Sequence, residues 1–112
     1  MTTPSTANPN TARINGSQVS AFRSEGYVVF DQPVFSQTMF DGLKNHFEQK
    51  LARLPADVRP ESMDVPHFTD RKLFDWLFSD EVLNLVEPIL GPNIALFSSH
   101  FICKPRGNGK RV

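Results

Sequence analysis

The feature that most constrains the fold of this chain is a single change in the spacing of its apolar residues, at Gly91-Pro92. Before that point, large apolar side chains recur every three or four residues, which is the period of an amphipathic helix. From Ile94 to Lys104 the period changes to two, which is typical of a strand with two different faces. The sequence therefore predicts an α+β fold in which helices precede a strand.

The expected helices are bounded by residues that commonly start or stop a helix. Ser17, Ser36 and Ser79 are candidate amino-terminal caps, because a serine hydroxyl accepts a hydrogen bond from an exposed helix N–H. Gly26 suits a helix stop, because glycine readily takes the left-handed conformation, and Pro55 cannot continue a helix. We expect helices over residues 17–26, 36–54, 70–78 and 79–90.

Only two segments have strand character. Tyr27-Val28-Val29-Phe30 is a short run of β-branched and aromatic residues, and 94–104 is the longer segment. The longer segment has a face of Ile94, Leu96, Ser98, His100, Ile102 and Lys104, of which the second half is polar. Because two strands without further partners are marginal in water, we expect the sequence to be part of a larger domain.

Composition excludes several classes of protein. The 12 Lys and Arg balance the 12 Asp and Glu, whereas a nucleic-acid-binding domain usually has a strongly basic face. No apolar run approaches the roughly 20 residues that span a bilayer. Residues 1–16 are polar and lack a signal-peptide pattern, so we expect a disordered tail on a soluble, cytoplasmic protein. The single Cys103 cannot form an internal disulfide and suits a small buried residue.

The three histidines are the candidates for metal binding or acid–base chemistry. His46-Phe47-Glu48 matches a metal-pair pattern, but residues two apart on a helix point about 200° apart, which favours a solvated helix face. His67 lies in a loop, where it either reaches a ligand or packs, and packing is the more common role. His100 shares a strand face with Ser98 and Lys104, so this polar half either binds a carboxylate or faces water.

Three phrases, taken in order, carry a resemblance to a known family. They are Phe-Arg-Ser-Glu-Gly-Tyr-Val-Val-Phe at 22–30, Leu-Asn-Leu-Val-Glu-Pro-Ile-Leu-Gly-Pro-Asn-Ile at 83–94 and Ser-His-Phe-Ile-Cys-Lys-Pro at 99–105. Together they resemble the amino-terminal part of the phytanoyl-CoA dioxygenase family, over residues 17–112. The resemblance implies an iron(II)- and 2-oxoglutarate-dependent oxygenase that hydroxylates a small organic substrate. It also implies a jelly-roll (double-stranded β-helix) core with helices outside, here incomplete.

The resemblance also implies roles for individual residues. The family's iron is held by two His and one carboxylate, and its first ligands form an H-x-D motif that this sequence does not reach. No catalytic or metal-ligating residue is therefore assigned, and we expect the chain alone to be inactive. In the family, the strand before the lysine-proline phrase lines the 2-oxoglutarate pocket, which makes His100 and Lys104 candidate cosubstrate-binding residues. His67 is a third candidate, from the loop that precedes the 70–78 helix.

The alternative is a small non-catalytic domain that binds an anionic partner. It would use the basic turn 104–111, which contains Lys104, Arg106, Lys110 and Arg111. The glycines of this turn do not make a phosphate loop, because that motif requires Gly at position 104 and Ser or Thr at position 111. A complete small domain should unfold in one cooperative transition, whereas part of a larger domain should aggregate through its unpaired strands.

Overall fold

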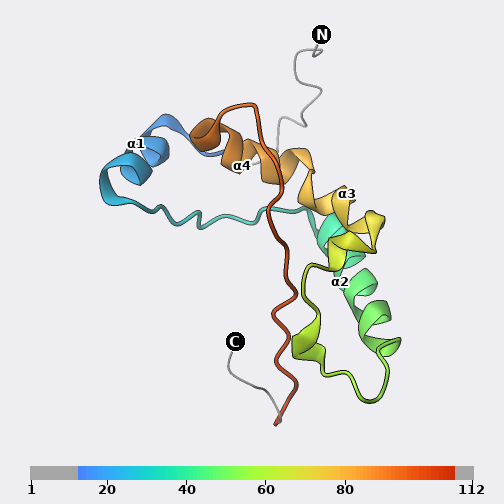
Figure 1. Ribbon diagram of the computed structural model, residues 1–112. Coiled ribbons are helices and arrows are strands. Elements are labelled where there is room, and N and C mark those ends of the chain that lie inside the picture. Colours follow the sequence, from blue (N-terminus) through green and yellow to red (C-terminus); the bar gives the residue numbers. More distant parts are fainter. Residues whose placement is uncertain (1–12, 108–112) are drawn as a thin grey trace. The chain divides into compact units, whose positions relative to one another are not determined.

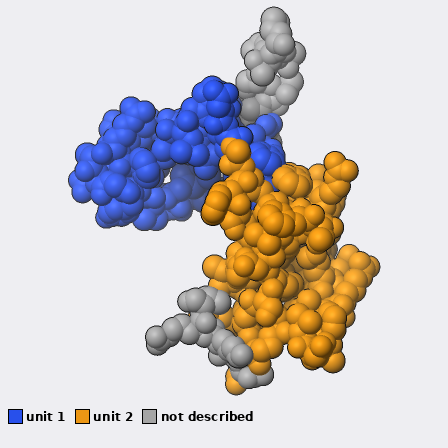
Figure 2. Space-filling model, viewed as in Figure 1, with its two compact units in different colours: residues 1–36, 76–94 blue, residues 37–75, 95–112 orange. Residues whose placement is uncertain are grey.

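The computed structural model describes residues 13–107 and divides the chain into two compact units (Figures 1 and 2). Unit 1 comprises residues 1–36 and 76–94, and unit 2 comprises residues 37–75 and 95–112. The helices are α1 (Gly16–Glu25), α2 (Gln37–Ala52), α3 (Phe74–Leu77) and α4 (Asp80–Leu90). Three short 3-10 turns lie between α2 and α3, namely η1 (Pro60–Ser62), η2 (Pro66–Phe68) and η3 (Arg71–Leu73). The expected tail is mostly outside the described residues.

Helix α1 of unit 1 is held at both ends by local hydrogen bonds. The Asn15 side chain accepts from the Gln18 N–H at 2.8 Å, and the Gln18 side chain accepts from the Asn15 N–H at 2.9 Å. This reciprocal capping box satisfies two exposed donors at once. The prediction that Ser17 is the cap is therefore wrong, because the helix begins earlier, at Gly16. Gly26 ends the helix in the left-handed conformation, at φ 85°, as predicted.

Helix α4 of unit 1 begins and ends where the sequence predicted. The Ser79 hydroxyl accepts from the Val82 N–H at 3.3 Å and donates to the Trp76 carbonyl at 2.8 Å. Pro88 lies within the helix, and the Gly91 N–H closes the last turn on the Glu87 carbonyl at 2.7 Å. The buried apolar residues of unit 1 include Ile14 and Trp76.

Unit 2 contains the longest helix and the 3-10 turns. Helix α2 begins directly after Ser36, as predicted, and ends at Ala52, two residues before the predicted end. The segment predicted as a helix over 70–78 is instead η3 followed by the single turn of α3. Among the described residues of this unit, the buried apolar ones are Met63, Pro66 and Leu73, so its core is small.

Neither segment with strand character forms a strand within residues 13–107. Residues 94–104 run as an extended chain whose β-pairing in the described structure is one isolated antiparallel bridge, Asp64 with His100 (Figure 1). Phe97 is 96 % exposed, and Tyr27, Val29 and Ile102 are also largely exposed. None of the helices in the described part combines the length and apolar character that crossing a membrane requires.

Candidate functional site

The candidate site of unit 2 is built where two segments far apart in the sequence, 63–65 and 99–101, pair over a few residues. The Val65 N–H donates to the Ser99 carbonyl at 3.0 Å, and the Phe101 N–H donates to the Met63 carbonyl at 3.4 Å. These two bonds flank the bridge between Asp64 and His100. The loop that carries His67 and the segment that carries His100 are thereby brought side by side, although about a third of the chain separates them.

His67 is packed inside unit 2. Its side chain is 7 % exposed, and its Nδ1 hydrogen-bonds the Ser99 hydroxyl. The rings of Phe68 and Phe74 meet the imidazole edge-on, with centroids 4.8 Å and 5.8 Å away. Of the two roles considered for His67, packing and ligand binding, these contacts match packing.

His100 lies on the other side of the same extended segment. Its Nδ1 lies 2.8 Å from Asp64 Oδ1, and this ion pair is more exposed than His67. The hydrogen bond with His100 lowers the pKa of Asp64, helped by the charge of His100 and the Val65 N–H, against a smaller opposing effect of burial. Because neighbouring residues in an extended chain point to opposite sides, Ser99 faces His67 while His100 faces away.

The three candidate cosubstrate residues therefore do not converge on one described cavity. His67 and His100 make separate contacts on opposite sides of the segment, and Lys104 is exposed. Burial along the segment also shifts from the face of Ile94 and Leu96 to the face that carries Ser99, so the predicted faces are not continuous. Of the predicted basic turn, Lys104 and Arg106 are exposed, whereas Lys110 and Arg111 lie outside the described residues.

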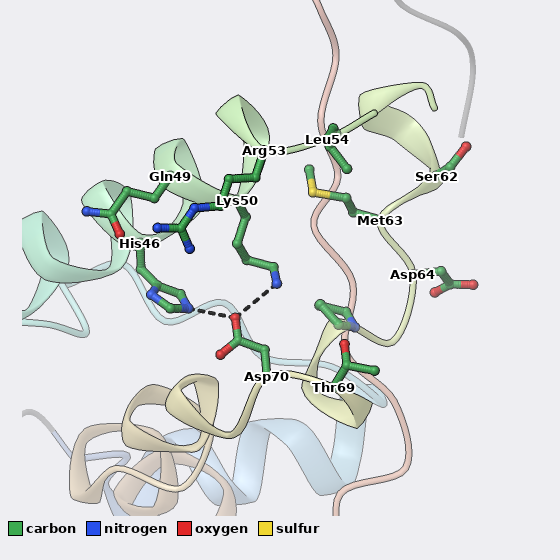
Figure 3. A pocket seen from close by; sticks show the side chains of 11 residues that line it. His46, Gln49, Lys50, Arg53, Leu54, Ser62, Met63, Asp64, Thr69 and Asp70 are labelled. Carbon is green, nitrogen blue, oxygen red and sulfur yellow. Dashed lines mark hydrogen bonds and ion pairs between the residues drawn. The ribbon is translucent and has the colours of Figure 1, made fainter. Parts of the chain in front are cut away.

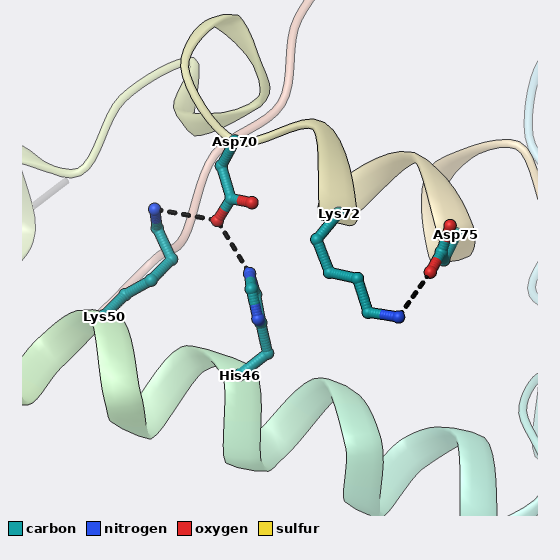
Figure 4. A network of polar contacts seen from close by, with 5 residues as sticks. All are labelled: His46, Lys50, Asp70, Lys72 and Asp75. Carbon is teal, nitrogen blue, oxygen red and sulfur yellow. Dashed lines mark hydrogen bonds and ion pairs between the residues drawn. The ribbon is translucent and has the colours of Figure 1, made fainter.

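A polar cluster joins Asp70 to two side chains of α2 (Figure 4), and the sequence did not predict it. Asp70 Oδ2 accepts from His46 Nε2 at 2.7 Å and from Lys50 Nζ at 2.9 Å. Burial acts to raise the pKa of Asp70, but the hydrogen bonds and charges of Lys50 and His46 together outweigh it and lower this pKa. A neighbouring pair, Lys72 with Asp75 at 2.6 Å, is far more exposed.

The expectation that His46 belongs to a solvated helix face is wrong, because this contact with Asp70 leaves it half-buried. Glu48, two residues further on, is exposed. The signal that would have found the cluster was the spacing of His46, Lys50 and Arg53, which places all three on one face of a helix. Asp70, the partner of His46 and Lys50, follows 24 residues after His46, and no helical period connects it to them.

The residues described do not fit an iron centre. Within 13–107, no group of three or more His, Cys, Asp or Glu side chains is arranged to hold a metal ion. The free Cys103 is half-buried and belongs to no such group.

Comparisons of the chain with models of protein families, with curated proteins and with solved structures give no match.

Proposed function

We propose that this chain forms part of an iron(II)- and 2-oxoglutarate-dependent oxygenase domain that hydroxylates a small organic substrate in the cytoplasm. The sequence support is the resemblance of residues 22–30, 83–94 and 99–105 to the phytanoyl-CoA dioxygenase family. The single structural observation in favour is the extended segment 94–104, which follows α4 and makes one isolated bridge within the described part of the chain.

An extended segment of this kind needs neighbours to be stable. Its unpaired N–H and C=O groups can pair with a further strand, and its exposed Phe97 and Ile102 can be buried against a second layer. Burying such side chains contributes roughly 1.5–3 kcal/mol each. A jelly roll supplies both a pairing strand and a second layer. The incomplete jelly roll that the resemblance implies would therefore explain why this segment has neither in the described structure.

The proposal assigns the iron ligands to polypeptide other than residues 13–107, since these residues contain no fitting set. No chemical step is therefore derived for them. His100 and Lys104 are kept as cosubstrate neighbours, because both are exposed on the same predicted face and an ammonium group can bind a carboxylate. His67 has the weaker case, because it is already enclosed by Ser99, Phe68 and Phe74.

The second candidate is the non-catalytic domain that binds an anionic partner. One observation favours it: the side chains of Lys104 and Arg106 are exposed and form no ion pair with another residue of 13–107. Two neighbouring cations on an extended segment attract an anionic surface at low ionic strength.

The test is 2-oxoglutarate turnover by the protein purified from its source, measured as succinate formed in the presence of iron(II) and ascorbate. The oxygenase proposal predicts succinate that depends on iron, and a KM for 2-oxoglutarate raised about tenfold by His100→Ala. Lys72→Gln, which removes an exposed charge elsewhere in unit 2, is the matched control and should leave this KM unchanged. No succinate under these conditions would contradict the proposal and favour the binding domain.

A further inference from the structure

Unit 2 contains a cavity of about 520 Å³ between α2 and the loop that follows it (Figure 3). Its volume lies within the range of about 300–1,000 Å³ that is typical of small-molecule sites. His46 and Lys50 project from α2, Arg53 directly follows the last residue of this helix, and Met63 lies on the facing loop. None of the three residues considered for 2-oxoglutarate lines this cavity.

The cavity is lined by two cationic side chains, Lys50 and Arg53, and by two carboxylates, Asp64 and Asp70. Lys50 is paired with Asp70 at 2.9 Å, so these two charges compensate each other. Asp64 also lines the cavity, but its carboxylate points away from α2 and is paired with His100 (Figure 3). The guanidinium of Arg53 makes no ion pair with any other residue between 13 and 107. The guanidinium of Arg53 is therefore available to an anionic ligand.

The donors of the cavity suit an oxyanion. The Arg53 guanidinium offers a planar fork that matches a carboxylate or phosphate, and Lys50 keeps two N–H donors beyond the one directed at Asp70. The Thr69 hydroxyl lines the same cavity and supplies a further donor. A ligand that brings its own negative charge would pair with Arg53 without breaking the contact between Lys50 and Asp70.

Part of the wall of the cavity is apolar. Leu54, Met63 and Pro66 line it, and Met63 and Pro66 are buried. An apolar wall beside a cationic group selects a molecule with one charged end and one short hydrocarbon end. Inorganic anions alone would leave this wall in contact with water.

We propose that this cavity binds a small organic anion, with its carboxylate or phosphate on Arg53 and Lys50 and its short apolar part on Leu54, Met63 and Pro66. The site is independent of the proposed oxygenase activity, since it uses none of His67, His100 and Lys104. It is also distinct from the basic turn of the alternative proposal.

The experiment is a titration of the 112-residue chain, followed by ¹H–¹⁵N NMR at constant ionic strength. The probes are sodium butyrate, monobutyl phosphate and the neutral butyramide, which share the same hydrocarbon tail. We expect at least one of the two anions to bind with a dissociation constant of about 1 mM, a realistic affinity for so small a ligand. The anion that binds more tightly identifies the preferred oxyanion, and butyramide should not bind measurably.

Variants at Arg53 and Lys44 distinguish binding at this cavity from a general attraction between the anion and the charge of the chain. Arg53→Gln should weaken anion binding about tenfold, because it removes a charged hydrogen-bond donor. Lys44→Gln is the matched control: it removes the same charge from an exposed position on α2 that does not line the cavity, and affinity should stay unchanged. Arg53→Lys, which keeps the charge but loses the fork, should weaken binding by a smaller factor and provides a second measurement should Arg53→Gln fail to fold.

Three results would overturn the proposal. One is the absence of binding by both anions, and another is equal binding by butyramide. The third is equal weakening by the Arg53 variants and Lys44→Gln, which would show that only the net charge of the chain matters. Succinate formation by the source protein is a separate readout, so the failure of either proposal can be recognised without the other.

Discussion

The two units of this chain are stabilised in different ways. In unit 1, the hydrogen bonds that end the helices join residues three or four apart, as at Asn15 with Gln18 and Ser79 with Val82. In unit 2, the polar contacts of the three histidines join residues 24 to 36 positions apart, as in Asp70 with His46 and His100 with Asp64. The architecture of unit 1 thus follows from local sequence, whereas that of unit 2 depends on chain segments meeting. The candidate site residues all lie in unit 2.

The largest expected effect comes from the most enclosed long-range contact of unit 2. His67→Ala should destabilise this unit by about 3 kcal/mol, because it leaves a cavity between Phe68 and Phe74 and removes the partner of Ser99. The measurement is the free energy of unfolding in urea. Phe68→Ala is the matched control, since Phe68 is 71 % exposed, and it should cost less than about 1 kcal/mol. Equal losses in the two variants would mean that the contact between His67 and Ser99 does not organise unit 2.

The difference between the units also explains which parts of the structure could be predicted. Gly26, Ser79 and Gly91 mark helix ends through their own conformations and side chains, and the structure has the helices ending or beginning there. The cap at Asn15 was missed, although the Asn-x-x-Gln spacing of a capping box was present in the sequence. The contacts of Asp70 with His46 and of His67 with Ser99 could not be predicted, because no local period connects their partners.

The candidate site shows the same division. Period two in residues 94–104 predicted a strand. The backbone there is extended (Figure 1), but within the described residues it forms one isolated bridge and no strand. Which side chains of the segment face the rest of unit 2 depends on the chain that pairs with it. In unit 2 this is the loop at Asp64, which forms the bridge with His100. For this reason His67 and His100, which the sequence grouped as cosubstrate candidates, make separate contacts.

A smaller effect is expected at the charged cluster on α2. Asp70→Asn should destabilise unit 2 by about 1.5 kcal/mol, because Lys50 and His46 are half-buried and would lose their shared anionic acceptor. Asp75→Asn breaks an ion pair that is exposed on both sides, so its cost should be below about 0.5 kcal/mol. Urea unfolding of both variants measures the two losses of stability. If Asp70→Asn costs no more than Asp75→Asn, the contacts of Asp70 with His46 and Lys50 do not stabilise unit 2.

A local contact in unit 1 should matter less and act only nearby. Asn15→Ala should cost about 1 kcal/mol, because the Gln18 N–H at the start of α1 loses its side-chain acceptor. Amide hydrogen exchange should accelerate in α1 and stay unchanged in α2. Faster exchange in both helices would contradict the contrast between a locally held unit 1 and a unit 2 held by distant contacts.

The smallest effect is on the pH dependence of stability. The folded-state pKa of Asp70 is lowered, so its contribution is present above the ordinary carboxyl pKa of about 3.9 and is lost as the pH falls through the lowered value. The stability difference between the unchanged chain and Asp70→Asn should therefore shrink as the pH falls below the ordinary carboxyl pKa. Urea unfolding across this acid range measures it, and a difference that grows there would contradict the assigned ion pairs.

The central claim is that residues 94–104 belong to a sheet whose other strands lie outside the described structure. The most direct test is amide hydrogen exchange of this segment, compared between the protein isolated from its source and the 112-residue chain alone. The account predicts protection of the amides on both sides of His100 in the source protein, and fast exchange of most of them in the isolated chain. Fast exchange in both would contradict the claim and, with it, the jelly-roll oxygenase.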